Sequence, residues 1–389
     1  MRYDRFNIFH AVIITGHPRK IKYLTHFPAV VESSPAVVRS QVTSQELLSP
    51  SLSLKSNHIA RKYIRKISEE ESYTMKNEVP IFFACNDKYV PYLDVAVLSL
   101  ISHVSPDRDY KITILKTDIT EENQKIILKH ATENVSIEFF DVNKMLESSK
   151  EKLPDMFYYS LAAYYRFFIE TAFPQYDKAI YLDCDVILLN DIAKLYDTDV
   201  SDYLVGAVYE QNTDRSPVFT NYVEEIIGIP HNTYFNSGVM VMNLAKFREE
   251  KVQEKFLWML DEYNFDSLAP DQEYLNVICH GKVKYLPNGW NKHSFPESPE
   301  GRLNLCHFAL GNKPWHYSDI INGNYFWEYA KKSEFYPFLR ESLDNYSDAD
   351  RKKDYDAFMQ LLESIENIKK SDRTFRKLWF CKEPAVSVK

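Results

Sequence analysis

Two aspartates lie two positions apart inside a strongly apolar segment of the chain. The segment spans residues 178–190, reads KAIYLDCDVILLN and has the composition of a buried strand. Charged side chains in such a strand are costly unless they are paired or bind a cation. Because residues i and i+2 of a strand point to the same side, Asp183 and Asp185 are predicted to converge on one point. Carboxylate oxygens are ligands that suit Mg²⁺ or Mn²⁺.

The Asp-x-Asp pattern alone has little specificity. It begins at four other positions, all in polar, turn-like or helical surroundings: Asp107, Asp197, Asp348 and Asp354. Only the pair at Asp183 and Asp185 falls in a predicted buried strand, so this pair is the candidate metal site. A salt bridge from the pair to a neighbouring Arg or Lys is the alternative that these residues leave open.

The surrounding elements alternate between strands and helices from Val79 onward. Apolar runs predict strands over 80–84, 110–116, 135–140 and 179–189, and three-to-four spacing predicts helices over 89–104, 121–132 and 161–171. Thr120 is the expected N-cap of the second helix. Such alternation predicts an α/β fold with a mostly parallel sheet, whose ligands gather at the carboxyl ends of the strands. The chain beyond Asn322 is predicted to be helical.

The composition argues against several classes of protein. A net charge of −8 disfavours a nucleic-acid partner, because nucleic-acid binders usually carry a basic stripe. Only 9 glycines occur and no glycine-rich phosphate loop appears, so charge or metal must bind any phosphate. The 5 cysteines form no C-x-x-C pair, which is typical of reduced cytoplasmic thiols. No apolar run of about 18 residues predicts a membrane-spanning helix.

Residues 1–74 differ from the rest of the chain in composition. They contain 11 Lys or Arg against 6 Asp or Glu, and the stretch 47–56, LLSPSLSLKS, is rich in serine. This composition predicts a flexible or weakly structured N-terminal extension. A globular pattern starts directly after Met75, so a second hypothesis is that residues 1–74 are an upstream translation that the functional protein does not need.

Eight segments resemble, in order, glycosyltransferase family 8, the retaining UDP-sugar transferases that include bacterial lipopolysaccharide galactosyl- and glucosyltransferases and glycogenin. They lie between Val79 and Trp315 and read IFFACNDKY, SLAAYYRFF, YLDCDV, VGAVYE, YFNSGVMVMNL, PDQEYLN, LPNGWN and HFALGNKPWH. The resemblance implies a GT-A-type, Rossmann-like mixed sheet, with a catalytic domain over 75–321 and a helical C-terminal region over 322–389. It implies a UDP-hexose donor, glucose or galactose, and a glycan, glycolipid or glycoprotein acceptor.

The resemblance also assigns residues to the metal and to the nucleotide. The implied ligands of Mn²⁺ or Mg²⁺ are Asp183, Asp185 and His307. The residues implied to contact the base, the ribose or the diphosphate are Ala84, Cys85, Asn86, Tyr89, Gly311 and Lys313. Two carboxylates and an imidazole are a normal set for Mn²⁺. Family members usually have glycine where Leu310 stands, so the backbone contact to phosphate is expected to shift to Gly311.

A further group of residues is implied for the sugar, the acceptor and catalysis. It comprises Arg166, Glu210, Asn236, Asp271 and Gln272, of which Arg166, Asp271 and Gln272 are the predicted catalytic residues. Gly238 is expected to let the backbone approach closely. Retention of configuration then follows either from Gln272 as nucleophile or from acceptor attack on the face that UDP leaves. We favour the second route, since an amide is a poor nucleophile.

Two other functions compete with sugar transfer. An inactive UDP-sugar-binding protein would keep the fold, and departures from the family pattern at Asn86, Tyr158 and Leu310 leave room for it. Glu273, which stands where the family has Asp, is a smaller departure. A sugar-phosphate nucleotidyltransferase shares the sheet type, but it is expected to carry a glycine-rich loop near the first strand, and IFFACNDKY contains no glycine.

The C-terminal segment 373–382, RTFRKLWFCK, interleaves basic and aromatic residues. Related bacterial enzymes dock to membranes through such tails. The resemblance therefore implies a cytoplasmic protein that contacts the inner face of the membrane peripherally. A helix packed on the catalytic domain is the alternative reading of the same residues.

Overall fold

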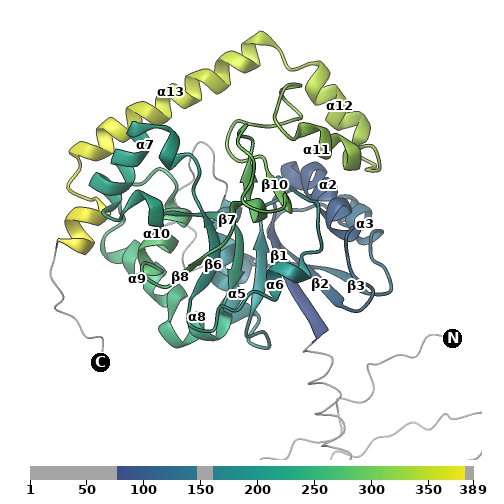
Figure 1. The fold of residues 1–389 in the computed structure, drawn as a ribbon, viewed down its shortest axis with the longest axis horizontal. Coiled ribbons are helices and arrows are strands. Elements are labelled where there is room, and N and C mark those ends of the chain that lie inside the picture. The colour runs from purple at the N-terminus through teal and green to yellow at the C-terminus, as the bar shows by residue number, and fades with distance from the viewer. Residues whose placement is uncertain (1–76, 147–160, 382–389) are drawn as a thin grey trace, which may run out of the picture. The chain divides into compact units, whose positions relative to one another are not determined.

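The predicted alternation of strands and helices forms a mixed β-sheet covered by helices (Figure 1). The computed structural model describes residues 77–146 and 161–381. The predicted N-terminal extension, residues 1–74, lies outside the described residues, as does Lys382 at the end of the basic tail.

The large sheet contains seven strands of the described chain, in the order β3-β2-β1-β4-β7-β6-β8. Their bounds are β1 (Glu78–Ala84), β2 (Asp109–Lys116), β3 (Val135–Asp141), β4 (Ala179–Leu182), β6 (Val205–Tyr209), β7 (Phe235–Met242) and β8 (Val283–Tyr285). β7 pairs antiparallel with both of its neighbours, whereas the other pairings are parallel. The sheet is therefore mixed and mostly parallel, which confirms the predicted fold class.

Helices follow the strands along the chain. Those before residue 300 are α2 (Val90–Ile101), α3 (Glu121–Leu128), α4 (Asn143–Leu146), α5 (Ile169–Ala172), α6 (Ala193–Tyr196), α7 (Pro217–Asn221), α8 (Leu244–Glu250), α9 (Val252–Glu262) and α10 (Pro270–Ile278). Shorter or non-α turns are η3 (Asp87–Tyr89), η5 (Leu161–Phe168), η6 (Thr213–Arg215), η7 (Tyr222–Ile227), η8 (His231–Thr233) and η9 (Asn288–Trp290). The helix predicted over 161–171 is instead the 3₁₀ helix η5 followed by α5. Thr120 caps α3 as predicted, because its hydroxyl accepts the N–H of Asn123.

The side chains of β1 supply two separate hydrophobic layers. Ile81 and Phe83 belong to the core that contains Leu93 and other apolar residues of α2. Phe82 belongs to the core on the other face, where its ring meets Phe173 edge-on with centroids 4.7 Å apart. Successive side chains of a strand point to opposite faces, so a strand buried on both faces reads as a continuous apolar run.

The segment that carries the two aspartates is not a single strand, and the prediction of one over 179–189 is wrong. β4 ends at Leu182, and β5 (Val186–Leu188) belongs to a second sheet of order β5-β10-β9, with β9 (Lys292–His293) and β10 (Leu305–His307). Asp183 and Asp185 therefore lie where the chain passes from one sheet to the other. Their convergence comes from this crossover and not from the two-residue period of a strand.

Residues beyond Asn322 are helical, as predicted: α11 (Gly323–Ala330), α12 (Tyr336–Asp344) and α13 (Asp348–Lys370). α13 crosses the top of the view in Figure 1, from α12 to α7. Its residues Ile365 and Ile368 are buried in the same core as Phe82. Ser347 and Asp350 form a capping box at its start.

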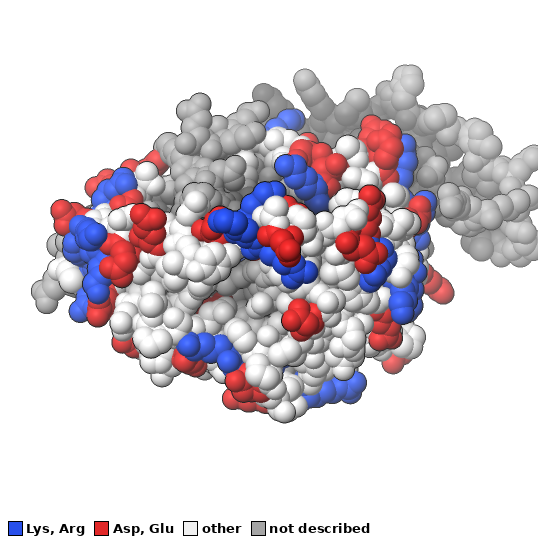
Figure 2. Space-filling view, turned by 90° about the horizontal axis from the view of Figure 1, so that it is seen from above, with Lys and Arg blue, Asp and Glu red and all other residues white. Residues whose placement is uncertain are grey.

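The outer surface of α13 is charged with both signs. Lys352 pairs with Asp356 and Lys353 pairs with Asp350 along this helix. Figure 2, which views the molecule from above, shows Lys and Arg intermingled with Asp and Glu on this side. Among the residues that the structure describes, no helix combines the length and the apolar character needed to cross a membrane.

The basic and aromatic tail packs onto the folded chain. Phe375 is fully buried, and its ring stacks on Phe265 with centroids 4.0 Å apart. η10 (Arg376–Phe380) follows, and Trp379 packs against the same core. Over the described residues 373–381 the tail is thus a packed helix, which was the alternative reading. Phe380 at its end stays 37% exposed.

Candidate active site

The carboxyl edge of the large sheet collects the ends of several strands. β1 and β4 are parallel neighbours, so the chain leaves both on the same side, after Ala84 and after Leu182. β7 is antiparallel to β4, which brings its first residues to this edge as well. β6 ends directly before Glu210. The predicted site residues on these four strands therefore meet at one edge.

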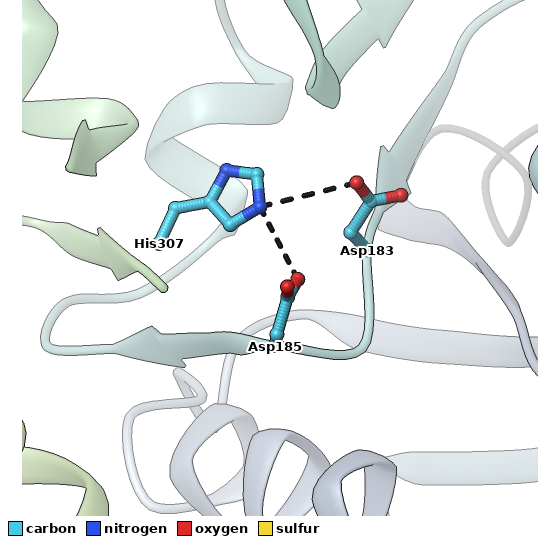
Figure 3. A group of neighbouring side chains, drawn as sticks. All are labelled: Asp183, Asp185 and His307. Carbon is cyan, nitrogen blue, oxygen red and sulfur yellow. Dashed lines mark ion pairs between the residues drawn. The ribbon is translucent and has the colours of Figure 1, made fainter. Parts of the chain in front are cut away.

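Asp183, Asp185 and His307 converge from the two sheets, with the imidazole facing both carboxylates (Figure 3). Asp183 follows β4, and the pairing of His307 with Val186 sets β10 beside Asp185. His307 Nε2 lies 3.2 Å from Asp185 Oδ1 and 3.9 Å from Asp183 Oδ2. One ligand atom from each of the three residues lies within 4.8 Å of the others. Two carboxylates and an imidazole so arranged could hold Mn²⁺ or Mg²⁺.

Two buried cations pair with the aspartates. Lys313 Nζ donates to Asp185 Oδ2 at 2.5 Å, and Arg166 Nη2 donates to Asp183 Oδ1 at 3.0 Å. Burial disfavours ionisation of Asp185, but Lys313 and His307 outweigh it and hold the pKa of this carboxyl below its usual range. The salt bridges that the sequence left open as an alternative are therefore present. The imidazole of His307 lies close to the same two carboxylates, so the salt bridges do not replace the predicted cluster.

Gly238 of β7 lies directly against this cluster. A Cβ at this position would be 2.5 Å from Asp183 Oδ2 and 2.5 Å from His307 Cε1. Its carbonyl oxygen accepts the N–H of Asp183 at 2.8 Å, so β7 also fixes the backbone of that aspartate. Only glycine leaves room for the two side chains to meet, in agreement with the close backbone approach expected at this residue.

A line of hydrogen-bonded carboxamides supports His307 on its other side. Asn291 Oδ1 lies 2.8 Å from His307 Nδ1, and Asn291 Nδ2 donates to Asn236 Oδ1 at 2.9 Å. Asn236 Nδ2 donates in turn to Glu210 Oε2 at 2.8 Å. Sequence reasoning assigned no role to Asn291, which is fully buried. Its place in the family-like loop LPNGWN was the signal that could have singled it out.

A cavity of about 580 Å³ opens beside the cluster. The structure brings every predicted site residue to its wall: Ala84, Cys85, Asn86, Tyr89, Arg166, Asp183, Asp185, Glu210, Asn236, Asp271, Gln272, His307, Gly311 and Lys313. The wall also contains Asp354 and Leu361 of α13, which lie outside the resembling segments. Its size is that of a pocket for a small-molecule ligand.

Tyr89 offers an aromatic surface at the β1 side of the cavity. Its side chain is 38% exposed, and its ring meets Tyr92 edge-on with centroids 5.1 Å apart. Tyr92 stacks on Trp315 at 4.0 Å, so Tyr89 is supported by a packed aromatic group. Asn86 Oδ1 accepts the N–H of Tyr89 at 3.1 Å and caps η3. The structure thus gives Asn86 a local structural task in addition to its predicted contact with the base.

Asp271 and Gln272 come from the first turn of α10. Gln272 Oε1 accepts the N–H of Ser237 at 3.0 Å, and Gln272 Nε2 donates to the Tyr234 hydroxyl at 3.2 Å. Asp271 Oδ2 accepts the Ser237 hydroxyl at 3.3 Å and lies 3.4 Å from Arg166 Nε. Burial raises the pKa of Asp271, and Arg166 acts in the opposite direction. Both ends of the Gln272 carboxamide are therefore fixed by the protein.

Glu273 reaches back to the start of α10. Its Oε1 accepts the N–H of Leu268, the N–H of Ala269 and the hydroxyl of Tyr222. Burial raises the pKa of this carboxyl to about 7, although these donors act against the rise.

Leu310 adopts the backbone conformation that glycine tolerates best, with φ of 57°. It stands where family members usually have glycine, so the tight turn is kept at residue 310 with a larger side chain. Gly311 lines the cavity but does not adopt a positive φ. The turn has therefore not moved to Gly311, and a phosphate contact there stays a prediction.

His293 is a buried residue that sequence reasoning missed. Its ring meets His307 edge-on at 5.2 Å, and its Nδ1 lies 3.5 Å from Glu210 Oε1. Neither ring nitrogen has a hydrogen-bond partner among the described residues. Burial lowers the pKa of His293 to about 4, against the attraction of Glu210, so the ring is neutral at pH 7.

Comparison with known proteins decides the family. Residues 80–319 match the family model described as Glycosyl transferase family 8, which is more than half of the chain. The chain belongs to this family. The resemblance read from the ordered segments is thereby confirmed, and the match ends before α11.

The relatives in this family include sugar transferases of two kinds. A putative glycosyltransferase from Haemophilus influenzae is 30% identical over 246 residues, 61% of this chain and 72% of the relative. The lipopolysaccharide 1,2-glucosyltransferase of Escherichia coli is 27% identical over 247 residues, 58% of this chain and 70% of the relative. The structure of the galactosyltransferase LgtC in complex with donor and acceptor sugar analogs is also similar, with 25% sequence identity and a TM-score of 0.54. The match covers 66% of this chain and 96% of LgtC.

Proposed function

We propose that this protein is a retaining hexosyltransferase that moves glucose or galactose from a UDP-sugar to a hydroxyl of a glycan, glycolipid or glycoprotein. The observation that carries the proposal is the meeting of Asp183, Asp185 and His307 in the wall of a cavity that also contains Asp271 and Gln272. Membership of family 8 supports sugar transfer. The names of a glucosyltransferase and a galactosyltransferase among its relatives support a hexose donor.

The leaving diphosphate needs positive charge where its negative charge grows. Asp183, Asp185 and His307 would hold Mn²⁺ or Mg²⁺, which supplies Lewis acidity to the leaving group when it is bound. Lys313 is 8% exposed, and although burial opposes it, Asp185 raises the pKa of this amine. Lys313 therefore keeps a fixed charge at a buried position, where such a charge acts strongly.

The nucleotide is proposed to lie along the β1 side of the cavity. The base would stack on Tyr89, whose ring face is exposed, with Ala84, Cys85 and Asn86 along its edge and the ribose. Gly311 would lie beside the diphosphate together with Lys313. Charge and metal rather than a glycine-rich loop then hold the phosphates.

The donor sugar is proposed to lie between α10 and the start of β7. Asp271 Oδ1 is buried and has no hydrogen-bond partner among the described residues, so it is available to a sugar hydroxyl. Arg166 holds the other oxygen of this carboxylate in place. Asn236 in β7 and Glu210 after β6 would contact the sugar or the acceptor.

Retention is proposed to follow from acceptor attack on the face that UDP leaves, with a phosphate oxygen taking the acceptor proton. The alternative needs Gln272 Oε1 as nucleophile. That atom accepts the N–H of Ser237 at 3.0 Å, which lowers its electron density and fixes its position. The bond supports a positioning role for Gln272 beside the anomeric carbon.

The acceptor is proposed to enter at the end of the cavity lined by α13. Leu361 of this helix, together with Phe219, Tyr222 and Val223, contributes apolar side chains to the cavity wall. Asp354 of the same helix also lines the cavity and accepts the hydroxyls of Tyr317 and Tyr346. Phe219, Tyr222 and Val223 lie within the matched residues 80–319, whereas α13 lies beyond them. Acceptor choice would therefore depend in part on residues outside the matched family segment.

The deciding experiment measures UDP release and sugar transfer from UDP-glucose and UDP-galactose, with Mn²⁺ and with EDTA. The test variant is Asp183→Asn/Asp185→Asn. The matched control is Asp197→Asn/Asp199→Asn, which removes the same two charges from an Asp-x-Asp pair outside the cavity. Metal-dependent release that the test variant loses and the control keeps is the expected result, and the anomeric NMR signal of the product reports retention.

The other outcomes separate the competing functions. If the protein binds UDP in a metal-dependent way but releases no UDP from either UDP-sugar, whichever acceptor is added, the inactive binding protein is favoured. Formation of UDP-sugar from UTP and a hexose phosphate would favour a nucleotidyltransferase, which family membership already disfavours. Absence of UDP binding would contradict the assignment of this cavity to the donor.

We further propose a cytoplasmic location with peripheral membrane contact, and a functional protein that does not need residues 1–74. The exposed side chains of Arg376, Lys377 and Phe380 on the packed tail support the membrane contact. Co-sedimentation with anionic lipid vesicles, lost in Phe380→Ala/Lys377→Ala, tests the contact. Full activity of a chain that begins at Met75 tests the role of the extension.

A further inference from the structure

We propose that Asn291 and Asn236 form a one-way hydrogen-bond relay that fixes His307 with its proton on Nδ1 and leaves Nε2 free to bind the metal. Asn291 is then a positioning residue of the metal site, although it contacts neither metal nor donor. The metal-binding part of the inference rests on the proposed function, whereas the state of the ring can be observed without it.

The relay has a fixed direction because Asn236 is held between two one-way groups. The N–H of Gly238 can only donate, and it donates to Asn236 Oδ1 at 3.0 Å. Glu210 Oε2 accepts from Asn236 Nδ2 at 2.8 Å. Burial opposes ionisation of Glu210, but hydrogen bonds from Asn212 and Asn236 act in the opposite direction and the pKa of this carboxyl lies below its usual range, so the carboxylate is ionised and accepts. Asn236 therefore cannot exchange its oxygen and nitrogen without losing both bonds.

The direction of Asn236 determines the direction of Asn291. Asn236 Oδ1 is the atom that faces Asn291, so Asn291 must present its Nδ2, and the two lie 2.9 Å apart. Asn291 Oδ1 then points at His307 Nδ1, 2.8 Å away. An amide oxygen only accepts, so the Nδ1 of His307 must carry the proton.

The proton on Nδ1 determines what the other ring nitrogen can do. A neutral imidazole with a proton on Nδ1 has its lone pair on Nε2, and Nε2 is the atom that faces Asp183 and Asp185. A metal held by the two carboxylates would therefore be offered this lone pair by His307. The reverse tautomer would direct an N–H at the metal and would leave Asn291 Oδ1 buried without a donor, which is costly.

The state of the ring is measured directly by nitrogen NMR of the full-length protein labelled at histidine, in the presence of Mg²⁺, which does not broaden the signals. The two ring nitrogens differ in chemical shift according to which one carries the proton, and the His307 signals are identified by their loss in His307→Gln. A proton on Nδ1 is expected. A proton on Nε2 would overturn the proposal whatever the variants do, and this measurement needs no substitution in the relay.

Mn²⁺ affinity of two variants tests the role of Asn291. Asn291→Leu removes the acceptor for the Nδ1 proton at similar volume and is expected to raise the Kd for Mn²⁺ about 10–100-fold. Asn291→Asp keeps an acceptor for that proton and is expected to bind Mn²⁺ more tightly than Asn291→Leu. Equal affinity of Asn291→Leu and the wild type would contradict the proposal.

The matched control is Asn243→Leu. Asn243 is also buried, and its side chain donates to the carbonyls of Val200 and Tyr203 and caps α8, without any contact to the relay. This variant is expected to lower Tm but to leave the Kd for Mn²⁺ unchanged.

The relay and the proposed function can fail independently. If sugar transfer fails while His307 carries its proton on Nδ1, the proposed function is wrong and the relay stands. If sugar is transferred while His307 carries its proton on Nε2, the relay is wrong and the proposed function stands.

Discussion

Gly238 lies so close to Asp183 that a Cβ at residue 238 would be 2.5 Å from the carboxylate oxygen Oδ2. The same atom would be 2.5 Å from His307 Cε1, so a single methyl group would separate two of the proposed metal ligands. The backbone of β7 is hydrogen-bonded on both sides and cannot move away. The approach of this strand therefore sets the size of the metal site.

Gly238→Ala is expected to weaken the metal site more than the fold. Overpacking costs about 1–3 kcal/mol of stability, and displacement of a ligand should raise the Kd for Mn²⁺ by at least about tenfold. Isothermal titration with Mn²⁺ and thermal unfolding measure the two effects. Gly311→Ala, where no atom lies within 4 Å of the added Cβ, is the control for Tm. An unchanged Mn²⁺ affinity in Gly238→Ala would show that these side chains do not bind the ion.

Leu310 stores backbone strain beside the cavity. A non-glycine residue in the left-handed region costs about 1 kcal/mol, and a β-branched residue there costs more. Leu310→Gly is therefore expected to unfold at or above the Tm of the wild type, and Leu310→Val below it. Thermal unfolding of the three proteins gives this order. A Tm of Leu310→Val equal to that of Leu310→Gly would mean that residue 310 does not hold the left-handed conformation in solution.

Glu273 should make stability depend on pH. Its pKa is about 7 in the folded chain against 4.5 in the unfolded chain, because burial disfavours the charge. Between these values the folded state binds more protons than the unfolded state, so the free energy of unfolding falls as pH rises from about 4.5 to about 7. Glu273→Gln is expected to lose less stability than the wild type over this interval.

The measurement is Tm at about pH 5 and about pH 8 for both proteins. Glu363→Gln, which removes an exposed carboxylate from α13, is the control and should follow the wild type. Parallel pH profiles of Glu273→Gln and the wild type would show that Glu273 titrates in its ordinary range.

Alanine substitutions of Phe375 and Phe380 should have very different effects on stability, although both residues belong to the tail. Phe375 is fully buried between Phe265 and Tyr274, so Phe375→Ala is expected to cost about 3–5 kcal/mol. Phe380 is partly exposed, and Phe380→Ala is expected to change stability by less than about 1 kcal/mol. Urea unfolding measures both. Equal, small effects would indicate that the tail is detached in solution and free to act as a membrane anchor.

The sequence by itself determined β1, β2 and β3 of the large sheet, the apolar run that contains β4, and the family. The continuous apolar runs that became β1 and β4 are legible because parallel strands are buried on both faces. The ordered motifs then selected fourteen site residues, and all of them line one cavity. Local patterns suffice for these predictions because each depends on residues that are close together in the chain.

Only the tertiary structure decided how the site is assembled. The break of the predicted strand at Leu182 depends on pairing between Val186 and His307, which are far apart in sequence. The relay through Asn291 and the burial of His293 depend on the pairing of β9 with β10, and single Asn and His residues carry no periodic signal. The contact of Leu361 in α13 with the cavity could not be predicted either. The packing of whole layers determines which elements meet, and no local stretch of the chain contains that information.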